Sequence, residues 1–223
     1  MTVREARYDR ATDWYVGFTR AWAAEARPFL PDDLSGRHVV DLACGLGDLS
    51  RLLAGRGASV TAVDLSVNML GHARSQEAER PLGIRYLVGD VTTSEWWDGD
   101  HFDGAVCNMA LMDVDDLDAA MATAARVVEP GGWFSFSLLH PCFPGLRNGV
   151  SEQLSSWPPD HGYASEGWWT THGDGLRGRV GANHRMLSTY LNATVRAGFE
   201  LEEFREPAAQ IPRFLIVRSR RRT

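Results

Sequence analysis

The 223-residue sequence contains no lysine, so arginine supplies all 23 of its basic residues. A lysine amine can form Schiff bases and act as a general base, whereas the guanidinium of arginine stays protonated. The absence of lysine therefore excludes Schiff-base chemistry and a lysine general base. It also excludes the Tyr-x-x-x-Lys pair on which one group of NAD(P)-dependent oxidoreductases depends.

Long apolar runs and cysteines are also scarce. No stretch of eighteen apolar residues is present, and no charged segment followed by an apolar one opens the chain, so neither a membrane span nor a signal peptide is predicted. The three cysteines, Cys44, Cys107 and Cys142, are an odd number. The first two lie in segments typical of a buried core or a ligand-binding loop. Reduced thiols and a cytoplasmic location are the expected result.

Excess positive charge is the third feature that the chain lacks. Its formal net charge is −6, whereas nucleic-acid-binding proteins normally concentrate positive charge on one surface. One basic run, Arg218 with Arg220, Arg221 and Arg222, lies at the extreme C-terminus, where a solvated tail is the simpler interpretation. We expect no nucleic-acid partner and no membrane partner.

The order of apolar and polar segments predicts an α/β fold. With 44% hydrophobic residues the chain can bury one substantial core, so residues 1–223 are expected to form a single domain. Alternating strands and helices imply a parallel sheet with helices on both faces. The expected strands are 38–43, 58–63, 84–88, 102–109, 132–139, 199–204 and 214–219, and the expected helices are 47–55, 66–78, 115–128 and 188–197, the last capped by Ser188.

Two segments depart from this alternation. Residues 1–30 place Trp14, Phe18 and Trp22 at helical spacing, which predicts an amphipathic helical cover for the domain. Residues 141–183 contain eight glycines, four prolines and three tryptophans. Long irregular segments inside compact domains are uncommon and often functional, so this segment is expected to be a substrate lid inserted into the fold.

The clearest functional signal is an apolar strand that leads into Gly45 and Gly47. Glycines in such a turn allow positive φ and a close approach of the backbone to a ligand, and the helix that follows offers unpaired N–H groups. Asp64 ends the next apolar strand, nineteen residues after Gly45, where a carboxylate can accept both hydroxyls of a ribose. The pattern predicts a site for a cofactor that contains a nucleoside.

Details of this turn argue against a dinucleotide. The G-x-G-x-x-G fingerprint requires a third glycine where this chain has Ser50. Asp41 and Asp48 flank the turn and would repel a pyrophosphate, because like charges at close range are unfavourable. A ligand that carries an ammonium and a sulfonium would tolerate both carboxylates.

Four motifs recur in order: Asp-x-Ala-Cys-Gly-x-Gly at 41–47, Asp64, Gly89-Asp90, and Phe102-Asp103 at the start of the fourth strand. In this order they resemble the class I S-adenosylmethionine-dependent methyltransferases, over residues from about 37 to about 140. The resemblance implies a Rossmann-like doubly wound sheet of about seven strands, mostly parallel with an antiparallel last strand. It implies S-adenosylmethionine (SAM) as the cofactor. The cofactor-binding residues that it implies are Tyr8, Tyr15, Asp41, Ala43, Gly45, Gly47, Asp64, Leu65, Met69, Asp90, Val91, Asn108 and Met109.

Two further segments, residues 139–143 and 184–193, resemble the small-molecule branch of that family. This branch includes quinone- and natural-product-modifying enzymes of the methyltransferase type 11 kind. Amino methyltransferases of DNA and proteins carry Asn-Pro-Pro-Tyr where this chain has Asn108-Met109-Ala110-Leu111, which argues against an exocyclic base amine as the acceptor. The resemblance implies methyl transfer to an aromatic or polycyclic secondary metabolite in natural-product biosynthesis.

Residues for the acceptor side are expected at the carboxyl ends of the parallel strands, where open α/β sheets bind ligands. His140 directly follows the fifth strand, and His184 lies where the lid returns to the core. Both are catalytic candidates as a general base, which is needed only if the acceptor is protonated. A hydrogen-bonded structural role is the alternative for each. The expected substrate contacts are Met112, Trp168, Trp169 and Arg185.

Several alternatives stay open at this point. Asp113, Asp115 and Asp116 could bind Mg²⁺, but an acidic group beside a helix N-terminus usually caps that helix, and no metal site is expected. A catalytically silent SAM- or nucleotide-binding regulatory module is the second functional hypothesis, and an NAD(P)-dependent oxidoreductase is the third. The lid could also form the interface of a homodimer. The acceptor atom stays open among O, N, S and C.

Overall fold

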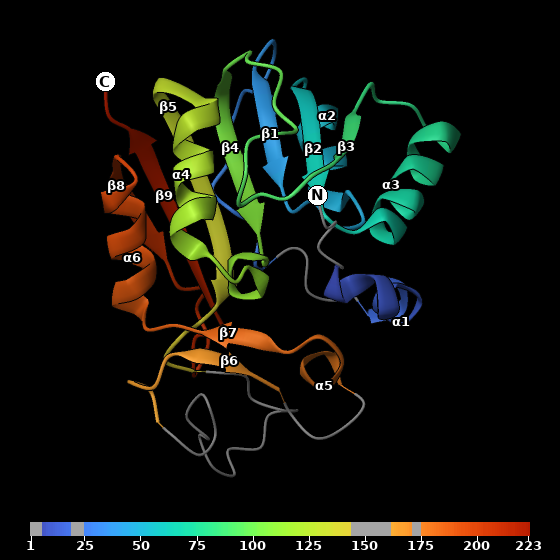
Figure 1. Ribbon diagram of the computed structural model, residues 1–223. Coiled ribbons are helices and arrows are strands. Elements are labelled where there is room, and N and C mark those ends of the chain that lie inside the picture. The colour runs from blue at the N-terminus through green and yellow to red at the C-terminus, as the bar shows by residue number, and fades with distance from the viewer. Residues whose placement is uncertain (1–5, 19–24, 144–161, 171–174) are drawn as a thin grey trace.

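A computed structural model describes residues 6–18, 25–143, 162–170 and 175–223. Its centre is one sheet of seven strands in the order β3-β2-β1-β4-β5-β9-β8 (Figure 1). The strand bounds are His38–Leu42 (β1), Ser59–Asp64 (β2), Arg85–Val88 (β3), Phe102–Asn108 (β4), Val128–Leu139 (β5), Phe199–Arg205 (β8) and Phe214–Arg221 (β9). Strands β1 to β5 run parallel, and β9 runs antiparallel to both of its neighbours. The predicted fold class, including the antiparallel last strand, is confirmed.

Helices cover both faces of this sheet, with bounds Asp48–Gly55 (α2), Val67–Glu79 (α3), Leu117–Val127 (α4) and Leu187–Arg196 (α6). Val39 and Val60 belong to a core on one face together with residues of α2 and α3. Val40 and Phe136 belong to a second core on the opposite face together with residues of α4 and α6. Successive side chains of a strand point to opposite faces, so each central strand buries residues in both cores. This explains the continuous apolar runs that predicted a parallel sheet.

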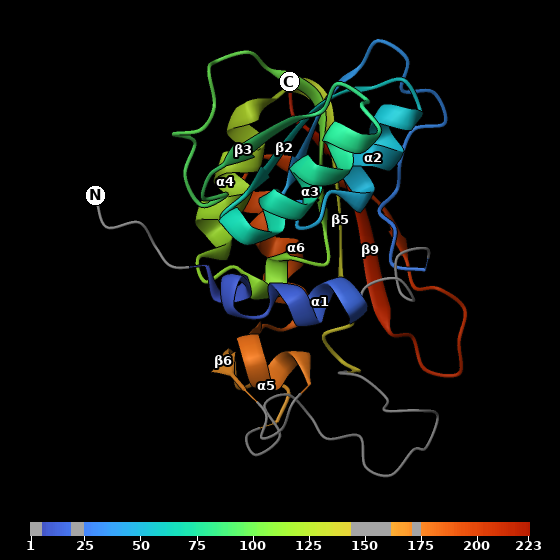
Figure 2. The same cartoon turned by 90° about the vertical axis from the view of Figure 1, so that its right-hand side faces the viewer.

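The described parts of the predicted cover and lid form short elements, η1 (Arg7–Arg10) and α1 (Thr12–Phe18) in the cover, and β6 (Gly167–Trp169), α5 (Leu176–Val180) and β7 (Ala182–His184) in the lid. They lie beyond the carboxyl ends of the parallel strands, near the short helix η3 (Leu111–Asp113) (Figures 1 and 2). Trp22 and Trp157 lie outside the described residues. Within the described ranges, every helix is too short or too polar to cross a membrane.

The C-terminal basic run is part of a strand and not a solvated tail, so that prediction is wrong. Arg218 and Arg220 lie in β9, and both pair with Glu202 on the neighbouring strand β8, at 3.2 Å and 2.5 Å. Arg222, directly after the strand, pairs with Glu200 at 3.5 Å. Opposite charges that face each other across a sheet favour strand pairing. The acidic partners lie in an earlier strand, so the run examined alone does not reveal them.

The predicted cap of the last helix is also wrong. Helix α6 begins at Leu187, with Met186 at the N-cap position, and Ser188 lies inside the first turn. The Tyr163 hydroxyl accepts a hydrogen bond from the Leu187 N–H at 2.7 Å. A Glu166 carboxylate oxygen accepts one from the Met186 N–H, also at 2.7 Å. The first N–H groups of a helix need an acceptor, and lid residues distant in sequence provide it here.

Candidate functional site

The turn between β1 and α2 has the geometry of a ligand-binding loop. Gly45 and Gly47 both have positive φ, +55° and +80°. A Cβ on Gly47 would lie 2.5 Å from the Tyr86 hydroxyl oxygen, so packing requires glycine at this position. A Cβ on Gly45 would meet no atom of the described residues within 4 Å. Gly45 therefore faces open space, which a bound cofactor can fill.

Asp64, at the end of β2, connects this turn to helix α3. Its Oδ2 accepts a hydrogen bond from the Gly45 N–H at 2.7 Å, and its Oδ1 accepts one from the Ser66 N–H at 2.8 Å. Burial raises the pKa of the Asp64 carboxyl group, and the two hydrogen bonds oppose this effect. An ionised carboxylate has about four acceptor positions, so Asp64 can also accept the two hydroxyls of a ribose.

Asp41 is completely buried beneath the turn. Its Oδ2 accepts a hydrogen bond from the Ser50 hydroxyl at 2.6 Å, whereas its Oδ1 has no hydrogen-bond partner among the residues that the structure describes. Burial raises the pKa of Asp41 to about 7. Ser50 stands where a dinucleotide fingerprint has its third glycine, and here its hydroxyl is hydrogen-bonded to Asp41. A cationic ligand near this carboxyl group would favour its ionised form.

This raised pKa predicts how stability depends on pH. An unfolded aspartate loses its proton near pH 4, whereas folded Asp41 keeps it until about pH 7. The folded protein therefore binds more protons between these values, and its free energy of unfolding falls as the pH rises through this window. Asp41→Asn removes this loss. As the pH rises from about 4 to about 8, the free energy of unfolding of the variant should increase by roughly 2–4 kcal/mol relative to that of wild type. Urea unfolding at a series of pH values measures this difference.

Asp103→Asn is the matched control for this measurement. Despite partial burial, the His38 N–H and the Arg37 guanidinium lower the pKa of Asp103. A group whose pKa is lowered by folding stabilises the protein above the pKa of the unfolded state, and this stability is lost as the pH falls. Asp103→Asn should therefore destabilise the protein relative to wild type as the pH rises, whereas Asp41→Asn should stabilise it. A difference between wild type and Asp41→Asn that stays constant with pH would contradict the assignment.

Other predicted cofactor residues lie at the ends of β3 and β4. Oδ1 of Asp90 accepts hydrogen bonds from the N–H and the hydroxyl of Thr92, at 2.8 Å and 2.7 Å. Its Oδ2 has no hydrogen-bond partner among the described residues, so it can accept from an amino group. Oδ1 of Asn108 accepts from the Ser137 hydroxyl at 2.7 Å. Of the remaining predicted residues, Leu65 is half-buried, and Met69 and Val91 are buried.

Two non-glycine residues of the described chain have left-handed backbone conformations. They are Ala43 and Met109, each with φ +57°, and they directly follow the adjacent central strands β1 and β4. Such conformations cost of order 1–3 kcal/mol each and concentrate at functional sites. Both residues were predicted to contact the cofactor, and their strain marks the same edge of the sheet.

The cover lies at this edge of the sheet, with α1 next to the carboxyl ends of the strands (Figure 2). Two adjacent residues of η1 attach it. The Asp9 carboxylate accepts a hydrogen bond from the Ser66 hydroxyl at 2.5 Å, and the Tyr8 hydroxyl donates to Asp113 Oδ2 at 2.8 Å. Tyr15 of α1 packs edge-on against Tyr8 with ring centroids 5.3 Å apart. The pKa of Tyr15 rises to about 12, mainly through burial and then through nearby carboxylates, those of Asp113, Asp48 and Asp64.

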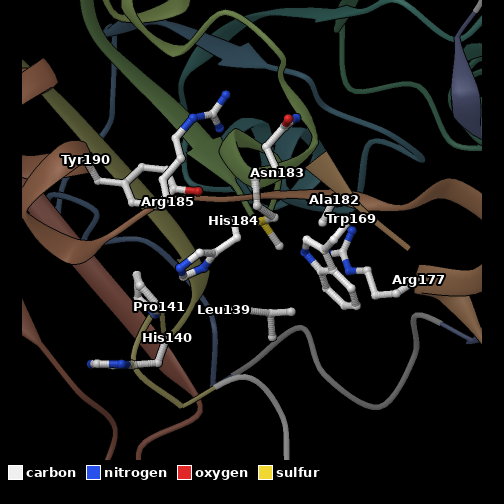
Figure 3. Close-up of a pocket in the computed structure, with 11 residues that line it drawn as sticks. Leu139, His140, Pro141, Trp169, Arg177, Ala182, Asn183, His184, Arg185 and Tyr190 are labelled. Atoms are coloured by element: carbon white, nitrogen blue, oxygen red, sulfur yellow. The ribbon is translucent and has the colours of Figure 1, made fainter. Parts of the chain in front are cut away.

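A pocket lies beside this edge, between the lid and the ends of the strands (Figure 3). Its lining combines apolar and aromatic side chains with two histidines and two arginines, a composition suited to a ligand with an aromatic ring. The residues that line it are Met112, Leu139, His140, Pro141, Trp169, Arg177, Ala182, Asn183, His184, Arg185 and Tyr190. It therefore brings together both predicted catalytic histidines and three of the four predicted substrate contacts.

The two histidines differ in their hydrogen bonds. His184 is buried, and its Nε2 lies 2.7 Å from the Tyr163 carbonyl oxygen. A carbonyl can only accept, so Nε2 carries a proton, and in the neutral imidazole Nδ1 is the nitrogen with the lone pair. No hydrogen-bond partner of Nδ1 lies within the part of the chain that the structure describes. Its ring extends between Leu139 and Tyr190 (Figure 3).

His140 uses both of its ring nitrogens. Nε2 lies 2.6 Å from a carboxylate oxygen of Glu206, and Nδ1 accepts a hydrogen bond from the Cys142 N–H at 3.2 Å. In the close-up, its ring extends away from Trp169 and His184 (Figure 3). The geometry therefore favours His184 over His140 as the acceptor-side base.

Two predicted substrate contacts have different surroundings from those expected. Trp168 is 55% exposed and does not line the pocket, whereas its neighbour Trp169 is 8% exposed and does. Adjacent strand residues point to opposite sides, which explains the difference. The guanidinium of Arg185 is directed away from His184, and donates to three carbonyl oxygens in and just after η3 (Figure 3). Only the remainder of Arg185 is left to line the pocket.

The acidic residues after β4 form ion pairs and a cap. Asp113 lies 2.5 Å from Arg177, and Asp115 lies 2.9 Å from Arg7. Asp116 caps α4 by accepting a hydrogen bond from the Ala119 N–H at 2.9 Å. The prediction that an acidic residue here caps the helix is confirmed for Asp116. Across the described ranges, no three His, Cys, Asp or Glu side chains are grouped to hold a metal. The roles of Arg177, Glu206 and Tyr163 had no signal in the sequence, because their partners are distant along the chain.

Comparison with known protein families identifies one match. Residues 40–136 match the model of a methyltransferase domain. Among curated proteins, ubiquinone biosynthesis O-methyltransferases of Coxiella burnetii and Alkalilimnicola ehrlichii are 34% and 38% identical over 110 and 109 residues. These alignments cover 49% and 48% of this chain, and 47% and 43% of the relatives. The chain thus spans about half the length of the curated relatives it matches.

Solved structures extend the similarity beyond this central part. An S-adenosylmethionine-dependent methyltransferase from Mesorhizobium loti is 32% identical, with a TM-score of 0.70 over 86% of this chain and 94% of that one. A TehB-like SAM-dependent methyltransferase from Corynebacterium glutamicum shares the fold, with 19% identity and a TM-score of 0.62 over 97% of this chain and 98% of that one. The Mesorhizobium loti similarity includes the sequence as well as the fold.

Proposed function

Because this chain belongs to the S-adenosylmethionine-dependent methyltransferases, we propose that it transfers a methyl group to a small hydroxylated aromatic acceptor. The observation that carries this proposal is the pocket between the lid and the carboxyl end of β5, in which the His184 imidazole lies among apolar and aromatic side chains. Curated relatives named as ubiquinone biosynthesis O-methyltransferases support an oxygen acceptor on a ring.

Residues of this chain have the positions and chemistry to hold the cofactor. Asp64 would accept the ribose hydroxyls, Gly45 would leave room for the ligand, and Asp90 would accept from the adenine amino group. Burial raises the pKa of Asp41 to about 7, and a cationic ligand bound at the turn would favour the ionised form of this carboxyl group. When bound, S-adenosylmethionine supplies a methyl group that the positive charge on the neighbouring sulfur has already activated for transfer.

The acceptor side then requires alignment, exclusion of water and one proton acceptor. Trp169, Met112 and Leu139 provide apolar surface against which a ring can pack. Nδ1 of His184 would accept the proton of an acceptor hydroxyl while the Tyr163 carbonyl keeps the imidazole in its tautomer. Proper alignment of the reacting atoms can itself supply a large part of the rate enhancement.

Calorimetric titration with SAM and with NADH tests the cofactor side of the proposal. We expect saturable binding of SAM and none of NADH. Incubation with SAM carrying a deuterated methyl group and a panel of phenols and catechols should then yield S-adenosylhomocysteine and a labelled product by mass spectrometry. Binding of SAM without turnover on any acceptor would favour the silent regulatory module, and binding of NADH alone would overturn the proposal.

Substitution of Asp64 tests the ribose contact. Asp64→Ala is expected to weaken SAM binding by roughly 1.5–3 kcal/mol, the range for a hydrogen bond to a charged group, measured by calorimetry. Asp103→Ala is the control, because Asp103 also accepts a backbone N–H but lies at the opposite end of the sheet. Equal dissociation constants for wild type and Asp64→Ala would refute the assignment.

The adjacent tryptophans of β6 provide an internal comparison for the acceptor side. Trp169→Ala is expected to raise the acceptor KM about tenfold or more, because it removes buried aromatic surface from the pocket. Trp168→Ala should leave the acceptor KM nearly unchanged, and neither substitution should alter SAM affinity.

Light scattering on the Trp168→Ala protein tests the alternative role of the lid as a dimer interface. Loss of a dimer in this variant would identify the exposed Trp168 as an interface residue.

A further inference from the structure

We propose that Asp113 is a positioning residue that fastens the cover to the lid and thereby controls exchange of the cofactor and its product. This inference rests on the proposed function, because it concerns the closure of the same site. Asp113 ends η3, the short helix that follows β4. It accepts hydrogen bonds from two segments that are distant in sequence, the cover and the lid.

The contacts to Asp113 come from both segments at once. From the cover, the Tyr8 hydroxyl donates to Oδ2 at 2.8 Å, and Arg7 donates to the Asp113 carbonyl oxygen. From the lid, Nη1 of Arg177 donates to Oδ1 at 2.5 Å. The side chains of the ion pair are only 13% and 11% exposed. Both carboxylate oxygens are therefore occupied, one by each segment.

A second contact joins the same two segments. The Arg179 guanidinium of α5 lies over the Trp14 ring of α1, 5.3 Å from its centroid. Figure 2 shows α1 between α5 and the carboxyl ends of the strands. The cover therefore contacts the lid through Trp14 and Arg179, and it contacts η3 through Tyr8 and Asp113. Tyr15 of the cover lies near Asp48 and Asp64, next to the cofactor turn.

This arrangement links the two halves of the site. The lid segment that carries Arg177 also carries Trp169 and His184 of the acceptor pocket. The cover segment that carries Tyr8 also carries Tyr15 beside the cofactor turn. Contact of an acceptor with Trp169 and His184 would therefore stabilise the segment that carries Arg177, and the Asp113 contacts would retain the cofactor. Removing one partner of a largely buried ion pair leaves an unpaired charge and is costly, so loss of Asp113 should release both segments.

The rate of product release measures this coupling without knowledge of the acceptor. We would bind S-adenosylhomocysteine to the 223-residue chain and follow its dissociation by stopped-flow tryptophan fluorescence. Asp113→Asn and Arg177→Gln should each accelerate dissociation about tenfold or more, and the double variant should add little, because both remove one shared interaction. Tyr8→Phe retains the ion pair and removes a single hydroxyl, so it should accelerate dissociation by a smaller factor of about three.

Asp118→Asn is the matched control. Asp118 forms an ion pair of 2.7 Å with Arg196, but both side chains are exposed and lie away from the cover and lid. Its dissociation rate should equal that of wild type. Unchanged rates in Asp113→Asn, Arg177→Gln and Tyr8→Phe, with folding confirmed by thermal unfolding, would overturn the proposal. Failure of the wild-type protein to bind S-adenosylhomocysteine would instead overturn the proposed function.

Discussion

Replacing His184 by alanine is expected to lower kcat by about 10²–10⁴-fold and to leave the SAM dissociation constant nearly unchanged. The imidazole lines the acceptor pocket and has one nitrogen, Nδ1, without a hydrogen-bond partner in the described chain, whereas Nε2 is bound to the Tyr163 carbonyl. Removal of this side chain eliminates the proton acceptor but leaves the cofactor turn intact. The measurement is single-turnover methyl transfer with the best acceptor from the phenol panel.

His184→Gln separates a catalytic role from a structural one. The glutamine amide can still donate to the Tyr163 carbonyl, but it cannot take a proton at neutral pH. We expect its thermal stability to approach that of wild type, while its kcat stays as low as that of the alanine variant. Recovery of activity together with stability would show that His184 acts only as a structural hydrogen-bond donor.

His140→Ala is the comparison within the same pocket. Both of its ring nitrogens are hydrogen-bonded, to Glu206 and to the Cys142 N–H, so its removal should lower the free energy of unfolding more than it lowers kcat. The prediction that His140 is the general base stays open to this test. A large loss of kcat in His140→Ala with normal turnover in His184→Ala would reverse the two roles.

Gly45→Val is expected to weaken SAM binding by at least about 100-fold, because its side chain would enter the space left for the cofactor and because valine is strained at positive φ. Calorimetry measures the dissociation constant. Gly36→Val is a close control, because Gly36 has φ +71° and lies before β1, away from the turn, and a Cβ there would likewise meet no atom within 4 Å in the described part of the chain. Equal losses in both variants would indicate general strain, and normal binding by Gly45→Val would exclude this turn as the site.

The cofactor side of the site could be predicted because its signals are local. Gly45 and Gly47 lie between one strand and one helix, and Asp64 ends the next strand. Strand, turn and helix are each specified by residues that are close in sequence, so their order determines which groups meet at the end of the sheet. Asp90 and Asn108 were implied by the family resemblance, and they lie at the carboxyl ends of β3 and β4, on the same edge of the sheet.

Tertiary contacts decided the functions of individual side chains on the acceptor side. His140 and His184 are both candidates by sequence position, and only the contacts to Glu206 and Tyr163 distinguish them. Trp168 and Trp169 are adjacent, and pairing of β6 with β7 determined which one is buried. Neither distinction can be read from spacing, because each depends on a partner in another segment.

The sequence by itself therefore determined the fold class, the alternation of strands and helices along the chain, and the cofactor. Periodicity and turn residues act over a few positions, so they are readable without coordinates. Only the tertiary structure decided that Asp113 meets Tyr8 and Arg177, and that the C-terminal arginines meet glutamates of β8. The strength of a buried charge pair depends on distance, exposure and partner, and folding sets all three.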